Sequence, residues 1–318
     1  MSFSFFIPTY KRSDSLKETI SSIFKYWKGD IKITISDNNE DDTAKNVVKE
    51  FDVNNIDYSP NKQNIGIDKN MLRFLELCKT KYCWLLGDDD SLSEKSYSDI
   101  SPLLEEDVDF IILLNGNYVK DYPDGIYAID NLNNVGNAFL SFWDKLPFGN
   151  VIINAERAKC LNYDEVIEKY VGTSHAYSGV LWELAISKFS SKKIGVMSSQ
   201  SIEVYNVEKS WVNSSVKIYL GEIPEWFKLL PQSLKKYSDK AYTNYLKQIF
   251  TLSTLSNFIV FSKQSEVNKD FVNNSISKMP FKYKLKWFFL NVCFPIYQIY
   301  TSIKKTLKTI INNILQKK

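Results

Sequence analysis

The first 115 residues alternate between short apolar runs and segments whose apolar side chains recur at helical spacing. Short apolar runs bounded by polar turns indicate buried strands, and a spacing of three to four residues indicates helices. This alternation predicts an α/β fold with a mostly parallel sheet and helices on both of its faces. The predicted strands are Phe3–Ile7, Ile31–Ser36, Asn55–Ser59, Tyr82–Gly87 and Asp109–Asn115. The predicted helices are 16–27, 44–51 and 67–78, and Ser15–Glu18 fits a capping box.

Four polar segments follow the first four predicted strands. They are Pro8–Thr9–Tyr10, Asp37–Asn38–Asn39, Asn61–Gly66 and Asp88–Asp89–Asp90. The carboxyl ends of parallel strands meet at one edge of a sheet, and ligands of open α/β sheets bind outside that edge. We therefore expect the four segments to line one crevice.

The three adjacent aspartates, Asp88 to Asp90, call for an explanation because neighbouring negative charges repel one another. Carboxylates around Mg²⁺ or Mn²⁺ lose that repulsion, and the cation completes its shell with water and substrate phosphate oxygens. The alternative is a solvated turn, since an Asp-rich segment followed by serine also suits a turn or a helix cap. The position directly after an apolar strand favours the cation site.

After residue 115 the pattern is weaker. Residues 148–160 predict a strand running into a helix, residues 174–187 a helix and residues 192–205 a pair of strands. Beyond Trp211 the sequence is helical and rich in aromatic residues. The four cysteines form no Cys-x-x-Cys pair, which favours buried free thiols and a reducing compartment.

The last 38 residues, 281–318, form a basic tail with eight lysines and no acidic residue, whereas the rest of the chain carries 32 basic and 37 acidic side chains. Lysines interleaved with aromatic and aliphatic residues suit a helix lying in the interface of an anionic membrane. A nucleic-acid patch and a helix packed on the body are the alternatives, and the aromatic density favours lipid. The apolar residues that recur at helical spacing near the end are Leu307, Ile310, Ile311, Ile314 and Leu315.

Neither a membrane-spanning helix nor a signal peptide is expected. No window of about 18 uninterrupted apolar residues occurs, and no basic segment precedes the short apolar patch at the N-terminus. We therefore expect a cytoplasmic protein that is peripheral on the inner face of the cell membrane.

Four segments, taken in order over roughly the first 115 residues, resemble the family 2 glycosyltransferases, which have the GT-A fold. They are "FSFFIPTYKRSDSLKETISSI", "ISDNNEDDT", "NKQNIGIDKN" and "YCWLLGDDDSL". The resemblance implies an enzyme that moves a sugar from a nucleotide-sugar donor to a hydroxyl of a glycan or lipid-linked acceptor. It also implies inversion at the anomeric carbon and a place in bacterial surface polysaccharide biosynthesis.

The resemblance implies a nucleotide pocket at the sheet edge. In the family, the loop after the first strand approaches the donor nucleotide, the acid after the second strand meets the base or ribose, and an Asn-x-Gly turn supports the pocket. The matching residues here are Pro8, Thr9, Tyr10, Asp37, Asn64 and Gly66.

The family's Asp-x-Asp segment binds Mn²⁺ or Mg²⁺ and the donor diphosphate, and the candidates here are Asp88, Asp89 and Asp90, with Asp88 also on the donor side. Many members have Leu-Asp-x-Asp-Asp, and aligning the last two acids places Gly87 at the first aspartate. That alignment makes Asp89 the main ligand, with Asp90 beside it. Taking Asp88 and Asp90 as the motif instead puts two side chains on one face of an extended segment. Both alternatives remain open.

An inverting transfer needs a group that accepts the proton of the acceptor hydroxyl. The family places an acid at a helix start for this, whereas here His175, the only histidine, stands at the start of the predicted helix. A histidine can act as base near neutral pH, and the alternative is a capping or packing role. Glu183, two helical turns later, ranks second. The further acids Asp164, Glu165 and Glu168 suit exposed helix charges better.

Two other functions stay open. A nucleotidyltransferase would use a similar sheet, but the segment "IPTYKRSD" lacks the glycines expected after its first strand. A non-catalytic, membrane-associated scaffold with a decayed donor site would explain the missing first aspartate and acidic base. Serine hydrolase, zinc and P-loop chemistries lack their motifs in this sequence.

These observations predict a chain of three parts. Residues 1–210 form a GT-A-like domain, in which 1–115 bind the nucleotide-sugar and 116–210 face the acceptor. Residues 211–280 form a helical extension, and residues 281–318 form the membrane-associating tail. The expected partners are the donor, a glycan or lipid-linked saccharide acceptor and an anionic membrane surface, with no nucleic acid.

Overall fold

The chain divides by its internal contacts into two compact units. The first takes in 1–208 and 225–241, and the second takes in 209–224 and 242–318. The predicted functional boundaries at residues 115, 210 and 280 stay predictions. The computed structural model of the chain describes residues 2–51, 54–114, 122–198, 202–204, 214–251, 254, 269–289 and 292.

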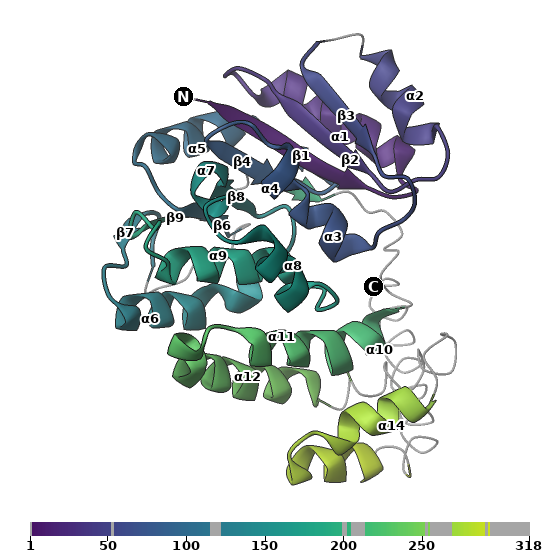
Figure 1. Cartoon of the computed structure of the whole chain (residues 1–318), viewed down its shortest axis with the longest axis vertical. Helices are drawn as coiled ribbons and strands as arrows, with labels where there is room; N and C mark the ends of the chain where they lie inside the picture. Colours follow the sequence, from purple (N-terminus) through teal and green to yellow (C-terminus); the bar gives the residue numbers. More distant parts are fainter. Residues whose placement is uncertain are drawn as a thin grey trace, which may run out of the picture. The chain divides into compact units, whose positions relative to one another are not determined.

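An eight-stranded sheet lies at the centre of the first unit (Figure 1). The strand order is β3-β2-β1-β4-β8-β6-β9-β7, and β3, β2, β1 and β4 run parallel to one another. Strand β8 is antiparallel to both β4 and β6, β6 and β9 are parallel, and β7 is antiparallel to β9. The bounds are β1 (Phe3–Thr9), β2 (Ile33–Asp37), β3 (Ile56–Pro60), β4 (Tyr82–Leu85), β6 (Phe110–Leu113), β7 (Gly125–Ala128), β8 (Val151–Asn154) and β9 (Lys193–Met197). A separate antiparallel pair joins β5 (Asp90–Leu92) to β10 (Ile202–Val204).

Helices connect these strands and continue after them. Up to β9 they are α1 (Ser13–Tyr26), α2 (Thr43–Glu50), α3 (Ile67–Leu72), α4 (Phe74–Leu77), α5 (Ser96–Glu105), α6 (Leu132–Phe142), α7 (Ala155–Ala158), α8 (Tyr163–Tyr170) and α9 (Ala176–Ile186). Later in the chain come α10 (Ser215–Lys217), α11 (Ile223–Leu229), α12 (Lys235–Ile249) and α14 (Lys269–Ser277). Short 3-10 helices span Trp143–Lys145 and Gln232–Leu234, and a π-helix spans Ile218–Glu222.

The predicted fold class is confirmed, since the sheet is mixed but largely parallel and helices flank it. Three local predictions were wrong. Helix α1 begins at Ser13, and its N-cap residue Arg12 makes no side-chain capping bond, so Ser15–Glu18 is not a capping box. The predicted helix 67–78 breaks at Arg73 into α3 and α4. Strands β9 and β10 belong to different sheets and do not pair with each other.

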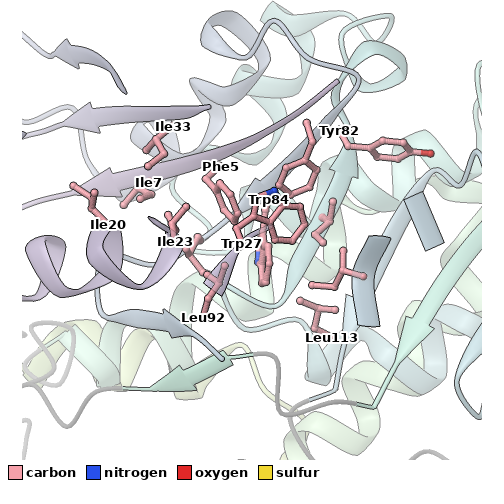
Figure 2. Packing of buried hydrophobic residues seen from close by; sticks show 14 of the residues in the cluster. Phe5, Ile7, Ile20, Ile23, Trp27, Ile33, Tyr82, Trp84, Leu92 and Leu113 are labelled. Atoms are coloured by element: carbon pink, nitrogen blue, oxygen red, sulfur yellow. The ribbon is translucent and has the colours of Figure 1, made fainter. Parts of the chain in front are cut away.

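An aromatic cluster fills the space between the sheet and α1 (Figure 2). The ring of Trp27 stacks on Phe3 at 4.6 Å and meets Phe5 edge-on at 5.2 Å, and Trp84 lies 5.5 Å from Phe5. Large buried aromatic rings dominate the energetics of such a core. The indole Nε1 of Trp84 donates a hydrogen bond to the carbonyl of Gly149 at 2.7 Å. The core therefore fixes the loop that contains Gly149.

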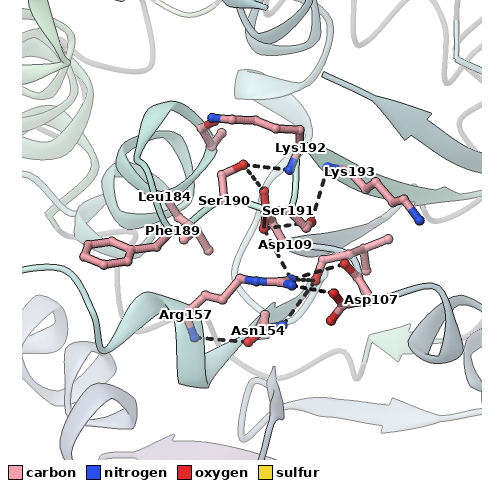
Figure 3. A network of polar contacts seen from close by, with 12 residues as sticks. Asp107, Asp109, Asn154, Arg157, Leu184, Phe189, Ser190, Ser191, Lys192 and Lys193 are labelled. Carbon is pink, nitrogen blue, oxygen red and sulfur yellow. Dashed lines mark hydrogen bonds and ion pairs between the residues drawn. The ribbon is translucent and has the colours of Figure 1, made fainter. Parts of the chain in front are cut away.

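A polar network holds together the segments just before β6 and β9, two parallel strands (Figure 3). The carboxylate of Asp109, which is fully buried, accepts hydrogen bonds from the backbone N–H of Ser191 at 2.7 Å and from its Oγ at 3.0 Å. Arg157 Nη1 lies 3.5 Å from the same carboxylate. Because a buried charge is stable only when it is paired and hydrogen-bonded, we assign this network a structural role.

The described part of the basic tail is helical at residues 281–289. Among the described residues, none of the helices combines the length and the apolar character needed to cross a bilayer. The apolar residues that recur at helical spacing from Leu307 to Leu315 lie outside the described residues.

Candidate active site

The four polar segments that follow the parallel strands meet at one edge of the sheet, because β3, β2, β1 and β4 are neighbours that run in the same direction. Hydrogen bonds then join one segment to the next. These are Thr9 Oγ1 to Asp88 Oδ2 at 2.8 Å, the Lys11 backbone N–H to Asn39 Oδ1 at 2.6 Å and Asn38 Nδ2 to the Gly66 carbonyl at 3.4 Å. The expected gathering of these segments is therefore present.

Arg12 stands between two of the three aspartates. Its Nη1 lies 2.9 Å from Asp88 Oδ1 and 2.9 Å from Asp89 Oδ2. Burial raises the pKa of Asp88 from 3.8 to about 6, against the opposing effects of the Arg12 charge and the Thr9 hydroxyl. The guanidinium thus balances part of the negative charge of Asp88 and Asp89.

Asp90 makes a different set of contacts. Its Oδ2 accepts a hydrogen bond from the backbone N–H of Gly87 at 3.2 Å. A Cβ on Gly149 would stand 2.0 Å from the same oxygen, and Gly149 has a φ of +96°, a conformation that favours glycine. Burial, with the nearby charge of Asp89, raises the pKa of Asp90 to about 7. Asp90 is therefore packed into a cradle of two glycines.

The pair formed by Asp88 and Asp89 fits a divalent cation. The Nη1 atom of Arg12 acts as a stand-in for such an ion, since a carboxylate oxygen from each residue faces it at 2.9 Å. Mg²⁺ and Mn²⁺ sites commonly use one or two carboxylates and leave the other positions to water and phosphate oxygens. Within the described part of the chain, no group of three or more His, Cys, Asp or Glu side chains is arranged to hold a metal. The two motif alignments drawn from the sequence stay predictions, and the contacts of Arg12 single out Asp88 with Asp89 as a further possible pair.

Asp37 lies at the end of β2 and is fully buried. Its Oδ2 accepts from the hydroxyl of Tyr58 at 2.6 Å, and its Oδ1 accepts from the backbone N–H of Asn39 at 2.7 Å. Burial raises the pKa of Asp37, and these two bonds oppose the rise. The side-chain Nδ2 of Asn39 is buried and has no hydrogen-bond partner among the described residues. An acceptor atom of a bound ligand would satisfy that donor.

The Asn-x-Gly turn forms the far end of the same edge. Asn64 Oδ1 accepts from the backbone N–H of Gly66 at 2.9 Å, and Gly66 adopts a φ of +82°, which suits glycine. Asn38 Oδ1 accepts from Asn61 Nδ2 at 2.8 Å and so ties the turn to the loop after β2. Pro8 is buried within β1, whereas Tyr10 is exposed at its end. Polar and backbone groups thus line this part of the edge.

His175 lies in a loop that is anchored by a buried carboxylate, Asp68. Asp68 Oδ2 accepts from the backbone N–H groups of Gly172, Thr173 and Ser174 at 2.8, 2.9 and 2.9 Å, and its Oδ1 accepts from Ala176 at 3.3 Å. Since Asp68 belongs to α3, which follows the Asn-x-Gly turn, it joins this part of the sheet edge to the start of α9. His175 is the N-cap residue of α9 but makes no side-chain capping bond.

The imidazole of His175 sits among aromatic rings. Its centroid lies 5.8 Å from that of Tyr177 and 5.3 Å from that of Trp226. Burial lowers the pKa of His175, against the effect of the Ser174 carbonyl bonded to its Nδ1. The ring of Phe148 packs on Tyr177 at 5.7 Å, and Phe148 precedes the glycine that cradles Asp90. This loop therefore lies close to Asp90 and also packs on Tyr177, whose ring neighbours that of His175.

Glu183, the second candidate base, is engaged elsewhere. Its Oε1 accepts a hydrogen bond from the hydroxyl of Tyr170 at 2.8 Å and forms an ion pair with Lys169. Both partners belong to α8, so this carboxylate links α8 to α9. The three further acids, at positions 164, 165 and 168, are exposed on α8.

Sequence reasoning missed three residues that shape the site: Arg12, Asp68 and Gly149. Arg12 lies in a polar segment after the first strand, where a basic side chain is commonly solvated. Asp68 carries no local signal, because its partners lie more than 100 positions away in sequence. Gly149 follows an aromatic residue in "PFGN", a turn signal that could have drawn attention to it.

Residues 4–146 match the model of the family described as glycosyl transferase family 2. Abequosyltransferase RfbV of Salmonella typhimurium is 35% identical over 117 residues, and the match spans 35% of this chain and 35% of that protein. The chain therefore aligns with only about a third of the length of this curated relative.

Two solved structures share the fold at low sequence identity. S. aureus TarS 1-349 in complex with UDP-GlcNAc superposes with a TM-score of 0.51 at 15% identity, covering 90% of this chain and 78% of that one. The mannosyltransferase PcManGT from Pyrobaculum calidifontis, in complex with GDP-Man and Mn²⁺, superposes with a TM-score of 0.53 at 11% identity, covering 92% and 87%. Residues 4–146, less than half of the chain, match glycosyl transferase family 2, and the chain has the GT-A fold.

Proposed function

We propose that this protein is a metal-dependent glycosyltransferase of surface polysaccharide biosynthesis. It would move a sugar from a nucleotide-sugar donor to a hydroxyl of a glycan or lipid-linked acceptor, with inversion. The family match and the relative named as an abequosyltransferase support sugar transfer. Neighbours solved with UDP-GlcNAc or with GDP-Man and Mn²⁺ support a nucleotide-sugar donor and a divalent cation.

The nucleoside end of the donor would lie against the loops after β2 and β3. Asp37 is held in place by Tyr58 and by the backbone of Asn39, so its carboxylate can accept from a ribose or base without rearranging. The unpartnered Nδ2 of Asn39 offers a donor to the same ligand. Preformed polar groups of this kind lose little free energy on binding.

The diphosphate would lie at the end of β4. Asp88 and Asp89 would hold the cation, which supplies positive charge to the leaving diphosphate when it is bound. Arg12 already contacts both carboxylates and is long enough to turn toward phosphate oxygens. Asp90, cradled by Gly87 and Gly149, would fix the backbone of this segment rather than contact the donor.

His175 is the residue that we assign as the base. A pKa below the ordinary value keeps the imidazole neutral at pH 7, so that its ring can take the acceptor's proton. The rings of Tyr177 and Trp226 neighbour the imidazole. The hydrogen bonds from Asp68 to backbone N–H groups, which we call the Asp68 clamp, hold the loop that contains His175. Glu183 has a place in the ion pair with Lys169 and is the weaker candidate.

We place the reaction at the inner face of the cell membrane. Residues 281–318 contain eight lysines and no acid, so an anionic lipid surface would attract this tail. A lipid-linked acceptor would be presented at that surface.

The observation that carries the proposal is that Asp88 and Asp89 share one positive charge, at the same sheet edge as Asp37. A thermal-shift screen of nucleoside diphosphates, with and without Mn²⁺, tests it. We expect one or two nucleotides to raise the melting temperature, and to do so only with the cation. No shift with any nucleotide, together with no release of nucleoside diphosphate from any donor, would favour a scaffold.

A further inference from the structure

The helix at residues 281–289 presents an exposed apolar face. Four large apolar side chains are exposed there, by 42% to 75% of their surface. They fall at positions i, i+4, i+7 and i+8, so they share one side of the helix. We call them the apolar stripe: Phe281, Leu285, Phe288 and Phe289.

The opposite face of this helix holds it on the second unit. Tyr283 and Trp287 are four residues apart and are buried, with exposures of 3% and 8%. The ring of Tyr283 lies 4.8 Å from that of Phe250. Because packing already uses this face, the apolar stripe is not what attaches the helix to its own unit.

Lysines border the apolar stripe on both sides. At 100° per residue, Lys282 and Lys286 lie on one flank of the stripe and Lys284 lies on the other. Lys282 and Lys286 are exposed, and Lys284 is half-buried. No acidic residue occurs from residue 281 to the end of the chain. An apolar centre between two basic flanks is the pattern of a helix that lies in a membrane interface.

We propose that the apolar stripe inserts into the interface of an anionic lipid membrane, with the three lysines at the level of the headgroups. The inference rests on the proposed membrane location and names the side chains that would produce it. A contiguous exposed apolar patch marks an interaction site. A symmetric contact with a second copy would bring lysine flanks together, whereas anionic headgroups complement them.

Vesicle co-sedimentation of the full-length protein tests the proposal. The probes are vesicles of phosphatidylcholine alone and of an equal mixture with phosphatidylglycerol. We expect the protein to bind the mixture better, and the double variant Phe288→Ser/Phe289→Ser to lose about tenfold or more in affinity for it. The triple variant Lys282→Gln/Lys284→Gln/Lys286→Gln should lose binding only to the anionic vesicles. Phe189→Ser, which removes an exposed aromatic side chain of the first unit, is the matched control and should bind as the wild type does.

Three results would overturn the proposal. They are unchanged binding by the double variant, no binding of the wild type to either vesicle, and a dimer that the double variant abolishes while vesicle binding stays absent. Equal melting temperatures establish that the variants are folded, and the single variant Phe288→Ser replaces the double variant if that fails to fold. The assay contains no sugar donor, so its failure would leave the proposed transfer reaction untouched.

Discussion

At the scale of single residues, the candidate site consists of buried carboxylates whose charges are balanced in different ways. Asp88 is paired with a guanidinium, Asp37 accepts from a phenol and a backbone N–H, and Asp68 accepts from four backbone N–H groups. Burial penalises each of these charges, so each needs its partners to remain ionised. The first two lie after strands and were found from sequence. Asp68 was not, since only the fold brings its partners to it.

In the proposed site, Arg12 and a divalent cation would compete for the same two carboxylates. Replacing Arg12 with glutamine removes the competing charge, so Mn²⁺ in the absence of nucleotide should bind about tenfold more tightly, a change of about 1.4 kcal/mol. Titration calorimetry with MnCl₂ measures this. Lys11→Gln removes a neighbouring charge that points toward Tyr10 and is the matched control. An equal gain in both variants, or no gain in the first, would contradict the competition.

Asp90 should make the stability of the metal-free protein depend on pH. Its pKa rises from 3.8 to about 7 on folding, so the folded state binds the proton more tightly than the unfolded state does. This contribution to stability is complete below about pH 4 and is lost as the pH rises to about 7. Between pH 5 and pH 8 the wild type should lose on the order of 2–3 kcal/mol relative to Asp90→Asn.

Urea unfolding in EDTA at the two pH values measures that difference. Asp164→Asn, an exposed acid on α8, is the control and should follow the wild type. If the free energy of unfolding changes equally with pH in the wild type and in Asp90→Asn, then folding does not raise the pKa of Asp90.

At the scale of elements, two connections decide where the site residues stand. One is the loop before β8, which Trp84 holds through the carbonyl of Gly149. The other is the loop before α9, which Asp68 holds through its backbone N–H groups. Neither loop has a regular pattern in the sequence, because both are shaped by partners on other elements.

The Gly149 position tests the first connection. Gly149→Ala forces a left-handed residue and also places a Cβ 2.0 Å from Asp90 Oδ2. Gly172→Ala, at a φ of +92° with open space around it, imposes the backbone strain without the clash. We expect Gly149→Ala to cost about 1–3 kcal/mol more than Gly172→Ala in urea unfolding. Equal costs would mean that Asp90 is free to move away.

The Asp68 clamp tests the second connection. Asp68→Asn leaves one acceptor oxygen for the four backbone N–H groups, so some of these buried donors lose their partner. The expected loss of stability is about 1–3 kcal/mol, with faster proteolysis in the loop at residues 172–176. Asp130→Asn, which alters an exposed acid, is the control. If the Asp68→Asn variant is as stable and as protease-resistant as the wild type, Asp68 does not stabilise this loop.

At the scale of the whole molecule, the first half of the fold was predictable and the second half was not. Strands β1, β2 and β4 are buried, β3 is a half-exposed edge strand, and all four are parallel and separated by helices, so their periods alternate cleanly. Strand β8 enters the sheet between β4 and β6 from much later in the chain, and β5 pairs with β10 across more than 100 residues. Such long-range pairings leave no local period. The edge where the four polar segments meet was therefore visible in the sequence, whereas the surroundings of His175 were not.

The central claim is that Asp88 and Asp89 together hold a divalent cation shared with a nucleoside diphosphate. Titration calorimetry of nucleoside diphosphates with MnCl₂ or with EDTA, on the wild type and on Asp88→Asn and Asp89→Asn, tests it most directly. The account predicts that Mn²⁺ strengthens nucleotide binding to the wild type by about tenfold or more and has no such effect on either variant. Equal nucleotide affinity with Mn²⁺ and with EDTA, or an undiminished Mn²⁺ effect in both variants, would contradict it.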